Sequence, residues 1–397
     1  MRKSDAAVIG GGPSGLHVAK LLSQSGLDVV VLEKKRVIGA DVICTGIIGK
    51  DVFEDFALPT NSILRKIRNI KVISSSGHVI SYQHPSDFAC IVDRKKFDQG
   101  LAEAARMEGA TIESGTRVTD ISVNDRGVDI RAEDEDGGEK KYAAAMAILA
   151  TGVEHQFNKK LGLGFPNEYL LGAQAEVDIP NGNTTTVFVG KDVAPGAFAW
   201  AVPTLPGKLR IGLVTSSEPR ACFQRLISRH YADQAGCFRD EEIRVKPIAQ
   251  GLVSRTYADR VIALGEAAGH VKTTTGGGIS FGLLCARIAA ELVAKCHRAG
   301  SYRAEDLSEY ERGWKKAIQR EILVGYYARK IYARLNDDQI IRLFELAQTN
   351  GIIPLIQEKG HFDCQSEVIL ALIKKAPVFS ILKGISKKPG ALEKTIA

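Results

Sequence analysis

The sequence lacks the cysteine patterns that stabilise secreted proteins or hold zinc. Its seven cysteines, at positions 44, 90, 222, 237, 285, 296 and 364, are scattered, odd in number and never spaced Cys-x-x-Cys. This argues against a disulfide framework and against a structural zinc site, so no metal centre is expected. A reducing compartment is the consistent choice, and we expect a cytoplasmic protein.

Long apolar runs are also missing. The longest stretch without a charged residue, Val193 to Gly207, has 15 residues and contains three prolines. It is shorter than the roughly 18 apolar residues that a membrane-spanning helix needs. We expect no signal peptide either, because the first strand is predicted to begin by Ala6. The protein is therefore predicted not to cross a membrane.

Charge of one sign is not in large excess. The chain has 53 Lys and Arg against 46 Asp and Glu, a net charge of +7 over 397 residues. An excess this small does not by itself indicate nucleic-acid binding, and no nucleic-acid partner is expected. Hydrophobic residues make up 45% of the chain and charged residues 25%, as in ordinary globular proteins of two or three domains.

What the sequence does contain is a dinucleotide-binding fingerprint at its N-terminus. An apolar run over 6–9 leads into the glycine-rich stretch 10–15, a helical pattern follows, and a second apolar run over 29–32 ends at Glu33. This is the order strand, G-x-G-x-x-G, helix, strand and acid that the fingerprint requires. The alternative, a glycine-rich turn in an ordinary βαβ unit, does not account for the coincidence of all these elements.

Each residue of the fingerprint has an expected role. Gly10 would allow the tight turn, Gly12 would let the backbone approach a pyrophosphate, and Gly15 would let the helix pack on the strand. Free N–H groups and the helix dipole would then bind the phosphates. Glu33 would accept a hydrogen bond from a ribose hydroxyl.

The pattern of the rest of the chain predicts an α/β fold, α+β overall. A Rossmann-like domain is expected in three pieces, 1–69, 85–153 and 252–300, including a helix that Asp93 opens. Strand-like stretches in 70–84 and 154–251 predict a second, antiparallel-sheet domain for substrate, with a hairpin over 70–83 and a helix over 221–235. A helical C-terminal region is predicted over 301–397.

A second glycine cluster, 275–279, opens another helix after a strand. Two such helix N-termini indicate a large cofactor bound at both ends. Together with the Cys44 loop, Asp93-Arg94, 150–152 and 265–269, these stretches resemble flavoproteins built like p-hydroxybenzoate hydroxylase. Within that superfamily the chain resembles the geranylgeranyl reductase family, most of all its archaeal-type digeranylgeranylglycerophospholipid reductases.

The most specific motif of that family is P-x-x-Y-x-W-x-F-P, which corresponds to 195–203 in this chain. Both prolines and Trp200 are kept, whereas Phe198 replaces tyrosine and Val202 replaces phenylalanine. In the family this segment lines the cavity for a prenyl chain, so the resemblance implies that Phe198 and Trp200 bind substrate. Two aromatics on one face of a strand would form a broad apolar wall; a plain core strand is the alternative.

The resemblance implies FAD as the cofactor. The implied cofactor-binding residues are Gly10, Gly12, Gly15, Glu33, Cys44, Thr45, Arg94, Val118, Glu266, Gly278 and Ile279. The first four would hold the ADP half, and Val118 would contribute its backbone. Gly278 and Ile279 would place N–H groups at the pyrimidine end of the flavin. For Arg94, a surface arginine at a helix start is the alternative. Glu266 stands where the family usually has aspartate.

Cys44 is the candidate catalytic residue. In archaeal members of the family a cysteine at this place lies beside the isoalloxazine, where a thiol could donate a proton or gate flavin reactivity. The alternative is a small buried hydrophobe, as most lone cysteines are. The chain departs from the family directly after it, with Thr45-Gly46-Ile47 where Gly-Glu-Gly is common.

The implied activity is reduction of isolated C=C bonds in geranylgeranyl chains, on a membrane ether-lipid precursor or another prenyl lipid. The alternatives are a flavin-dependent monooxygenase or halogenase of the same fold, and a non-catalytic FAD-containing prenyl-lipid binder. No second complete dinucleotide fingerprint follows, so the external electron donor is left open between a ferredoxin, a deazaflavin and NADPH.

Basic residues gather with aromatic and aliphatic ones on the predicted C-terminal helices. They are Lys315, Lys316, Arg320, Arg329, Lys330, Arg334, Lys374, Lys375, Lys383, Lys387, Lys388 and Lys394. Basic amphipathic helices suit an anionic membrane surface, which here would be the inner face of the cell membrane. A solvated basic face on a helical bundle is the alternative.

Overall fold

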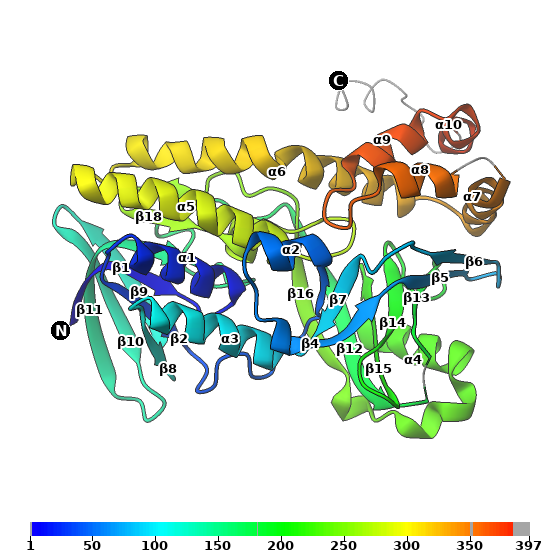
Figure 1. The fold of residues 1–397 in the computed structure, drawn as a ribbon, viewed down its shortest axis with the longest axis horizontal. Coiled ribbons are helices and arrows are strands. Elements are labelled where there is room, and N and C mark those ends of the chain that lie inside the picture. The colour runs from blue at the N-terminus through cyan, green and yellow to red at the C-terminus, as the bar shows by residue number, and fades with distance from the viewer. Residues whose placement is uncertain (1, 181, 350–351, 384–397) are drawn as a thin grey trace.

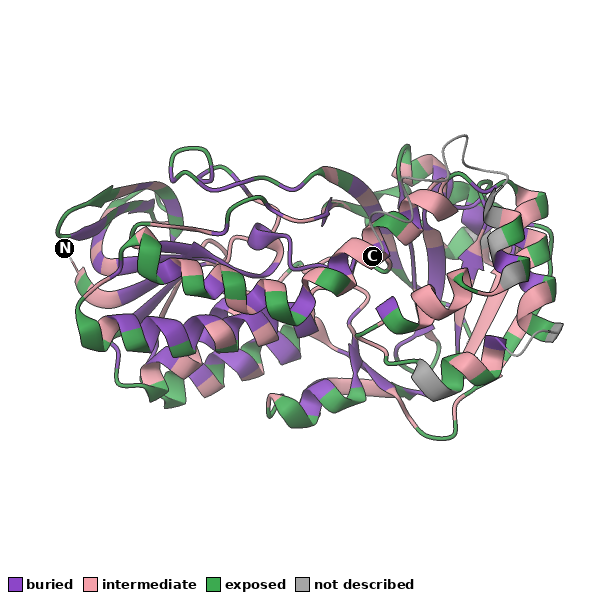
Figure 2. Cartoon of the chain, turned by 90° about the horizontal axis from the view of Figure 1, so that it is seen from above, coloured by how far each residue is buried: buried purple, intermediate pink, exposed green. Residues whose placement is uncertain are grey.

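The computed structural model describes residues 2–180, 182–349 and 352–383 and arranges them around three sheets (Figure 1). The first sheet lies at one end of the molecule and the second at the other. A small third sheet lies between these two sheets, and helix α6 extends from the end with the first sheet toward the end with the second. Figure 2 shows that the buried residues concentrate on the strands and on the helix faces turned toward them.

The first sheet is built from distant stretches of the chain. Its strands are β1 (Arg2–Ile9), β2 (Val29–Glu33), β8 (Thr111–Ser114), β9 (Arg117–Asn124), β10 (Gly127–Glu133), β11 (Glu139–Leu149), β17 (Tyr257–Ala258) and β18 (Val261–Ala263). The order is β17-β18-β11-β1-β2-β8, with β10 pairing β11 and β9. The strands from β18 to β8 along this order pair in parallel. The predicted Rossmann-like sheet is therefore observed, completed by a strand from far downstream.

Apolar sequence explains why these strands sit in the centre. Residues 6–8 and 29–31 are fully buried, as expected for parallel strands covered on both faces. One face packs on α1 (Pro13–Gln24), α3 (Arg94–Met107) and α5 (Ile279–Ala299). Asp93 caps α3, as predicted, by accepting hydrogen bonds from the N–H groups of Lys95 and Lys96 at 2.9 and 3.1 Å.

The second sheet has seven strands in the order β16-β12-β15-β14-β13-β5-β6. They are β5 (Asn69–Ser74), β6 (Val79–Gln83), β12 (Glu168–Asp178), β13 (Thr184–Val189), β14 (Phe198–Pro203), β15 (Lys208–Thr215) and β16 (Arg244–Gln250). The predicted hairpin over 70–83 is observed and joins this sheet through a parallel β13–β5 pair. Helix α4 (Pro219–His230) covers one face. It ends five residues before the predicted end at 235.

The third sheet was not predicted. It consists of β3 (Ile47–Gly49), β7 (Ala89–Val92) and β4 (Ile63–Ile67). Helix α2 (Lys50–Asp55) lies between β3 and β4 in the chain. An apolar layer joins it to the second sheet and contains Ile67, Ile91, Leu170, Trp200 and Val214. The strands are short, and their pairing is set by residues distant in sequence, so local patterns do not reveal them.

The predicted helical C-terminal region is observed. It comprises α6 (Ala304–Tyr332), α7 (Asp337–Thr349), α8 (Ile352–Lys359), α9 (Ser366–Ile373) and α10 (Ala376–Lys383). Within the described residues, no helix is both long and apolar enough to span a membrane. The domain boundaries given above stay a prediction.

The basic residues of α6 are not all free to meet a membrane. Arg329 is buried and pairs with Glu168, as Lys330 does. Lys315 pairs with Glu311 at 2.6 Å. Lys316 and Arg320 are exposed. Three further basic positions, 387, 388 and 394, lie outside the described residues, as does the side chain at 383.

A buried histidine on α1 predicts a pH dependence of stability. Burial, and then the charges of Lys20 and Arg287, lower the pKa of His17 to about 4. Its Nδ1 has no hydrogen-bond partner in the described structure. The unfolded chain therefore binds more protons between pH 6.5 and 4, and stability falls as the pH falls through that window.

His17→Leu is expected to flatten this dependence. At pH 5 the variant should recover about 2 kcal/mol of unfolding free energy relative to wild type, with a much smaller difference at pH 7. Denaturant unfolding at pH 5 and pH 7 measures both values. Phe56→Leu changes the ring that packs against His17 at 5.4 Å without removing a titrating group, so it should lower stability equally at both values. An unchanged slope in His17→Leu would contradict the assignment.

Candidate cofactor and substrate site

The carboxyl ends of the parallel strands meet at one edge of the first sheet. Gly10 follows β1, Gly152 lies just beyond β11, and Glu266 follows β18. The β1 strand lies between β2 and β11, which is where the strand order changes direction and where ligands bind in sheets of this type. Gly10 has a φ of +113°, and an added Cβ would lie 2.3 Å from the carbonyl oxygen of Ala150. Only glycine fits here.

The N-terminus of α1 is open on the side where a phosphate is expected. Gly12 is the N-cap, and no side chain of the described structure caps the helix. A Cβ added at Gly12 would meet no atom within 4 Å, whereas one at Gly15 would lie 2.1 Å from the Gly10 carbonyl oxygen. The glycines therefore divide the expected roles, with space at Gly12 and tight packing at Gly15. This cradle fits a pyrophosphate.

Glu33 holds the glycine-rich turn directly. Its Oε2 accepts a hydrogen bond from the Gly11 N–H at 2.6 Å, and its Oε1 accepts one from the Lys35 N–H at 2.9 Å. The Glu33 carbonyl accepts from the Thr116 N–H at 2.8 Å, which brings the start of β9 and Val118 to the same corner. A ribose contact for Glu33 and a backbone contact for Val118 stay predictions.

The N-terminus of α5 lies beside that of α1. A Cβ added at Gly282, in the first turn of α5, would lie 2.1 Å from Ser14 Oγ, and one at Gly265 would lie 2.7 Å from it. Gly278 is the N-cap of α5, and among the described residues no side chain caps this helix. Two uncapped helix N-termini thus converge at the sheet edge. Their dipoles suit an extended cofactor with negative charge at two places.

Glu266 connects the first sheet to the second. Its Oε2 lies 2.9 Å from Nζ of Lys246 on β16. A Cβ added at Gly152 would lie 3.9 Å from the same oxygen, so the carboxylate is at the sheet edge as predicted from the strand ends. Whether it contacts cofactor stays a prediction.

Arg94 is buried, and the surface-arginine alternative is wrong. Its side chain is 11% exposed, and Nη2 lies 3.0 Å from Oδ2 of Asp98. Burial lowers the pKa of Arg94, but the nearby Asp98 carboxylate and the Cys44 sulfur outweigh burial and place that pKa above its ordinary value. The guanidinium is therefore a fixed positive charge beside Cys44.

Cys44 is half-buried and has polar neighbours. Its Sγ accepts a hydrogen bond from the Gly46 N–H at 3.3 Å and lies next to the Arg94 guanidinium. It is therefore not a plain buried hydrophobe. The second sheet holds its loop, because Arg210 donates to the Thr45 carbonyl at 2.7 Å and Gln174 to the Cys44 carbonyl at 3.4 Å.

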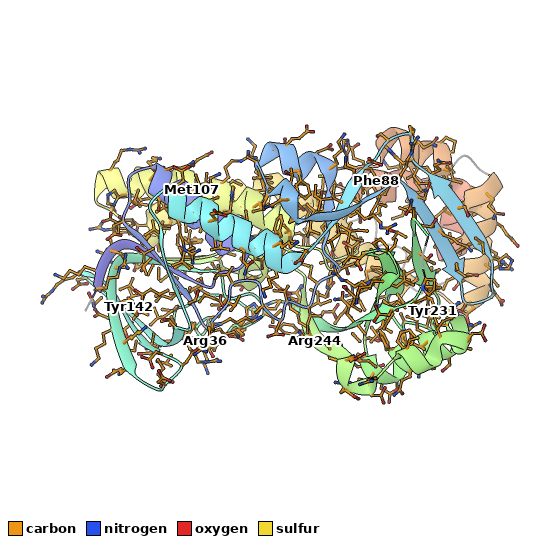
Figure 3. All side chains as sticks on the ribbon, turned by 60° about the horizontal axis from the view of Figure 1, so that its bottom comes forward. Arg36, Phe88, Met107, Tyr142, Tyr231 and Arg244 are labelled. Carbon is orange, nitrogen blue, oxygen red and sulfur yellow. The ribbon has the colours of Figure 1, made fainter. Side chains whose placement is uncertain are left out.

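A surface cavity of about 380 Å³ opens beside this loop. It is lined by Gly39, Ala40, Asp41, Val42, Asp93, Arg94, Lys95, Arg210 and Arg244. Arg244, labelled in Figure 3, lies between the two ends of the molecule and pairs with Asp41 at 3.0 Å. The loop that carries Asp41 and Cys44 is thus held by side chains of the second sheet at the place where Arg94 lies next to Cys44.

Phe198 and Trp200 lie on one face of β14, as predicted. Their ring centroids are 5.8 Å apart. Trp200 is 8% exposed, and its ring packs closely on Gly212 of β15, where an added Cβ would be 2.5 Å from it. Its Nε1 has no hydrogen-bond partner in the part of the chain that the structure describes. The rings belong to the apolar layer between the second and third sheets, so the wall is packed against other apolar side chains rather than open.

Lys272 and Asp363 were not predicted from the sequence as site residues. Their side chains meet at 2.6 Å beside the second glycine cluster, although they lie 91 positions apart in the sequence. Lys272 directly precedes the uncharged stretch 273–286. A single charge next to a glycine cluster was a signal in the sequence that could have identified this lysine. Nothing in the sequence near Asp363 indicated that it reaches this place.

Comparison with known proteins gives matches over most of the chain. A family model described as FAD dependent oxidoreductase matches residues 74–292, and one described as NAD(P)-binding Rossmann-like domain matches residues 8–51. The digeranylgeranylglycerophospholipid reductase 1 of Methanosphaera stadtmanae is 31% identical, covering 88% of this chain and 89% of that protein.

Two further proteins are similar over most of the chain. The digeranylgeranylglycerophospholipid reductase of Methanoculleus marisnigri is 29% identical over 89% of this chain and 94% of its own length. A solved structure from Thermoplasma acidophilum, described as geranylgeranyl bacteriochlorophyll reductase-like, superposes with a TM-score of 0.83 at 21% identity. It covers 97% of this chain and 100% of that one, which shows that the fold is shared.

Gly12→Ala is expected to weaken FAD binding by about tenfold or more while leaving the FAD-free fold intact. The added methyl meets no protein atom but projects from the backbone at the phosphate cradle. FAD titration and thermal unfolding of the FAD-free protein measure the two effects. Gly15→Ala should instead lower the unfolding temperature, because of the 2.1 Å clash.

Gly236→Ala is the matched control, since its Cβ also enters open space but far from the cradle in sequence. It should change neither quantity. Wild-type FAD affinity in Gly12→Ala would contradict the cradle.

Proposed function

The chain belongs to the FAD-dependent oxidoreductase family that includes the digeranylgeranylglycerophospholipid reductases, and on this basis we propose that it reduces isolated C=C bonds in the geranylgeranyl chains of a lipid. The single observation that supports this substrate class is the aromatic pair Phe198 and Trp200 in an entirely apolar layer. Ile47, the first residue of β3, packs against that layer and comes three residues after Cys44 in the chain. An apolar lipid chain bound along this layer would lie close to the cofactor site.

The enzyme is an FAD-dependent oxidoreductase, and FAD, once bound and reduced by the external donor, would supply the hydride for the reduction. Gly12 and the first turn of α1 would hold the pyrophosphate, and Glu33 the ribose. The turn at Gly278 would face the ring, where free N–H groups stabilise negative charge. Arg94, Glu266 and the backbone of Thr45 and Val118 complete the proposed set of contacts.

The proposed reduction needs a hydride on one carbon and a proton on the other. The hydride carries two electrons, which an external donor returns to the protein after each turnover; a ferredoxin, a deazaflavin or NADPH would serve. We assign the proton to the Cys44 thiol, which then regains one from solvent. Arg94, fixed beside the sulfur, would stabilise the thiolate that remains.

Association with an anionic membrane surface stays a prediction. It now depends on the exposed residues Lys316, Arg320, Arg334 and Lys374 rather than on the whole basic set, because Arg329 and Lys330 are paired with Glu168. A lipid substrate would be delivered from such a surface.

An anaerobic turnover assay tests the proposed reaction. The bound flavin is reduced with dithionite, a geranylgeranyl lipid is added, and flavin reoxidation is followed by absorbance together with product mass. We expect reoxidation with a gain of two hydrogens for each double bond reduced. Reoxidation only after O₂ is admitted would instead indicate a monooxygenase, and no turnover under either condition would indicate a lipid binder.

Cys44→Ala is expected to retain FAD but to slow flavin reoxidation by the lipid about a hundredfold, the usual loss when a general acid is removed. The rate is measured in the same anaerobic assay. Cys237→Ala removes an exposed cysteine and is the matched control, with the wild-type rate. If Cys44→Ala turned over as fast as this control, Cys44 would have a structural role only.

A further inference from the structure

The turn that opens α5 encloses a buried lysine. The Lys272 N–H donates to the Gly277 carbonyl at 2.8 Å, and the Gly276 N–H donates to the Lys272 carbonyl at 2.7 Å. The Lys272 side chain, 8% exposed, folds back under this turn. A Cβ added at Gly277 would lie 3.0 Å from Lys272 Cε and 3.5 Å from Nζ. The ammonium group is therefore directly beside the glycines proposed to face the flavin.

Asp363 holds this ammonium group in place. Its Oδ1 lies 2.6 Å from Lys272 Nζ and accepts a hydrogen bond from Ser280 Oγ, also at 2.6 Å. Its Oδ2 would be 2.3 Å from a Cβ added at Gly49, so the carboxylate lies tightly against that backbone. The ring of Phe362 lies 4.7 Å from Lys272 Nζ. The lysine thus has one carboxylate and one aromatic face as neighbours.

The segment that carries Asp363 is anchored from a second helix. The Glu321 carboxylate on α6 accepts hydrogen bonds from the N–H groups of Gln365 and Ser366 at 2.8 and 2.9 Å. Thr274 Oγ1, in the glycine-cluster turn, donates to Gln365 Oε1 at 2.6 Å. Both the turn and α6 therefore fix the loop between α8 and α9. A charge pair placed so firmly in a largely buried position costs desolvation energy, which favours a role beyond holding the loop.

We propose that Lys272 and Asp363 are positioning residues that set the reduction potential of bound FAD. Reduced flavin carries more negative charge than oxidised flavin, and a fixed cation beside the turn stabilises the reduced form through a low-dielectric path. The negative charge of Asp363 offsets part of the positive charge of Lys272. The potential then reflects the balance of the two charges. This inference rests only on FAD binding at the α5 turn and not on the identity of the lipid.

Two variants should move the potential in opposite directions. Lys272→Met removes the cation and keeps an unbranched side chain, so it should shift the equilibrium toward oxidised FAD by about tenfold or more, which is about 30 mV lower for a two-electron couple. Asp363→Asn removes the offsetting carboxylate and should shift it toward reduced FAD. A role confined to packing or to anchoring the loop predicts no such reversal of sign.

Lys295→Met is the matched control. Lys295 also belongs to α5 and pairs with Glu309 at 3.1 Å, but it lies near the far end of the helix with 66% of its side chain exposed. Solvent and distance screen the charge of Lys295, so Lys295→Met should have the same FAD reduction potential as the wild-type protein. Lys272→Arg keeps a cation at this position, so its FAD reduction potential should stay near the wild-type value, unlike that of Lys272→Met.

The midpoint potential is read from the visible absorbance of the FAD-loaded protein during reductive titration, together with FAD affinity. Opposite shifts in Lys272→Met and Asp363→Asn support the proposal. Shifts of the same sign, or no shift while FAD remains bound, overturn it. If Lys272→Met does not retain FAD, the sign of the Asp363→Asn shift decides alone.

No lipid enters this titration, so a protein that fails the turnover assay still reports the effect of the pair. A wild-type protein that binds no FAD would overturn both proposals.

Discussion

The close contact between α1 and α5 is the constraint on which the site depends. Ser14 fits between Gly265 and Gly282 with no room for a Cβ at either glycine. This contact brings together a helix that begins at residue 13 and one that begins at residue 279. It also aligns their N-termini at the carboxyl edge of the same parallel sheet. The positive ends of both helix dipoles then act on one region, which a cofactor with charge at both ends can use.

The second sheet completes the site through a few polar contacts rather than through a broad interface. Lys246 reaches Glu266 at one strand end, and Arg210 reaches the loop of Thr45. Lys246 and Arg210 are both positively charged side chains of the second sheet, and each contacts an oxygen acceptor near the first sheet. They place the Cys44 loop and the apolar layer of Trp200 next to the cofactor edge. Reaction chemistry and apolar substrate can therefore meet without either sheet supplying both.

Sequence patterns predicted local features well wherever one residue type is dictated by backbone geometry. The glycines at 10, 12 and 15, the Asp93 cap and the hairpin over 70–83 follow from steric or hydrogen-bonding rules that act within a few residues. The aromatic pair on β14 followed from the two-residue period of a strand. The third sheet and the true end of α4 did not follow, because short strands and helix ends depend on their packing partners.

The candidate site was predictable only in part for the same reason. The family motif pointed to Arg94, but not to its burial against Asp98 and Cys44. Long-range ion pairs carry no local signature, because either partner alone reads as an ordinary surface charge. Lys272 and Asp363 are the clearest case, since they lie 91 positions apart in the sequence.

By itself the sequence determined the cofactor class, the Rossmann-like βαβ start and the second glycine cluster, since these depend on spacing along the chain and, at Gly10 and Gly276, on a positive φ that favours glycine. Tertiary structure alone decided which charges surround the cofactor turn and how far the aromatic wall is covered. The physical reason is that burial and charge pairing depend on distance in space. That distance is set only when α6, the loop before α9 and the second sheet have packed against the first.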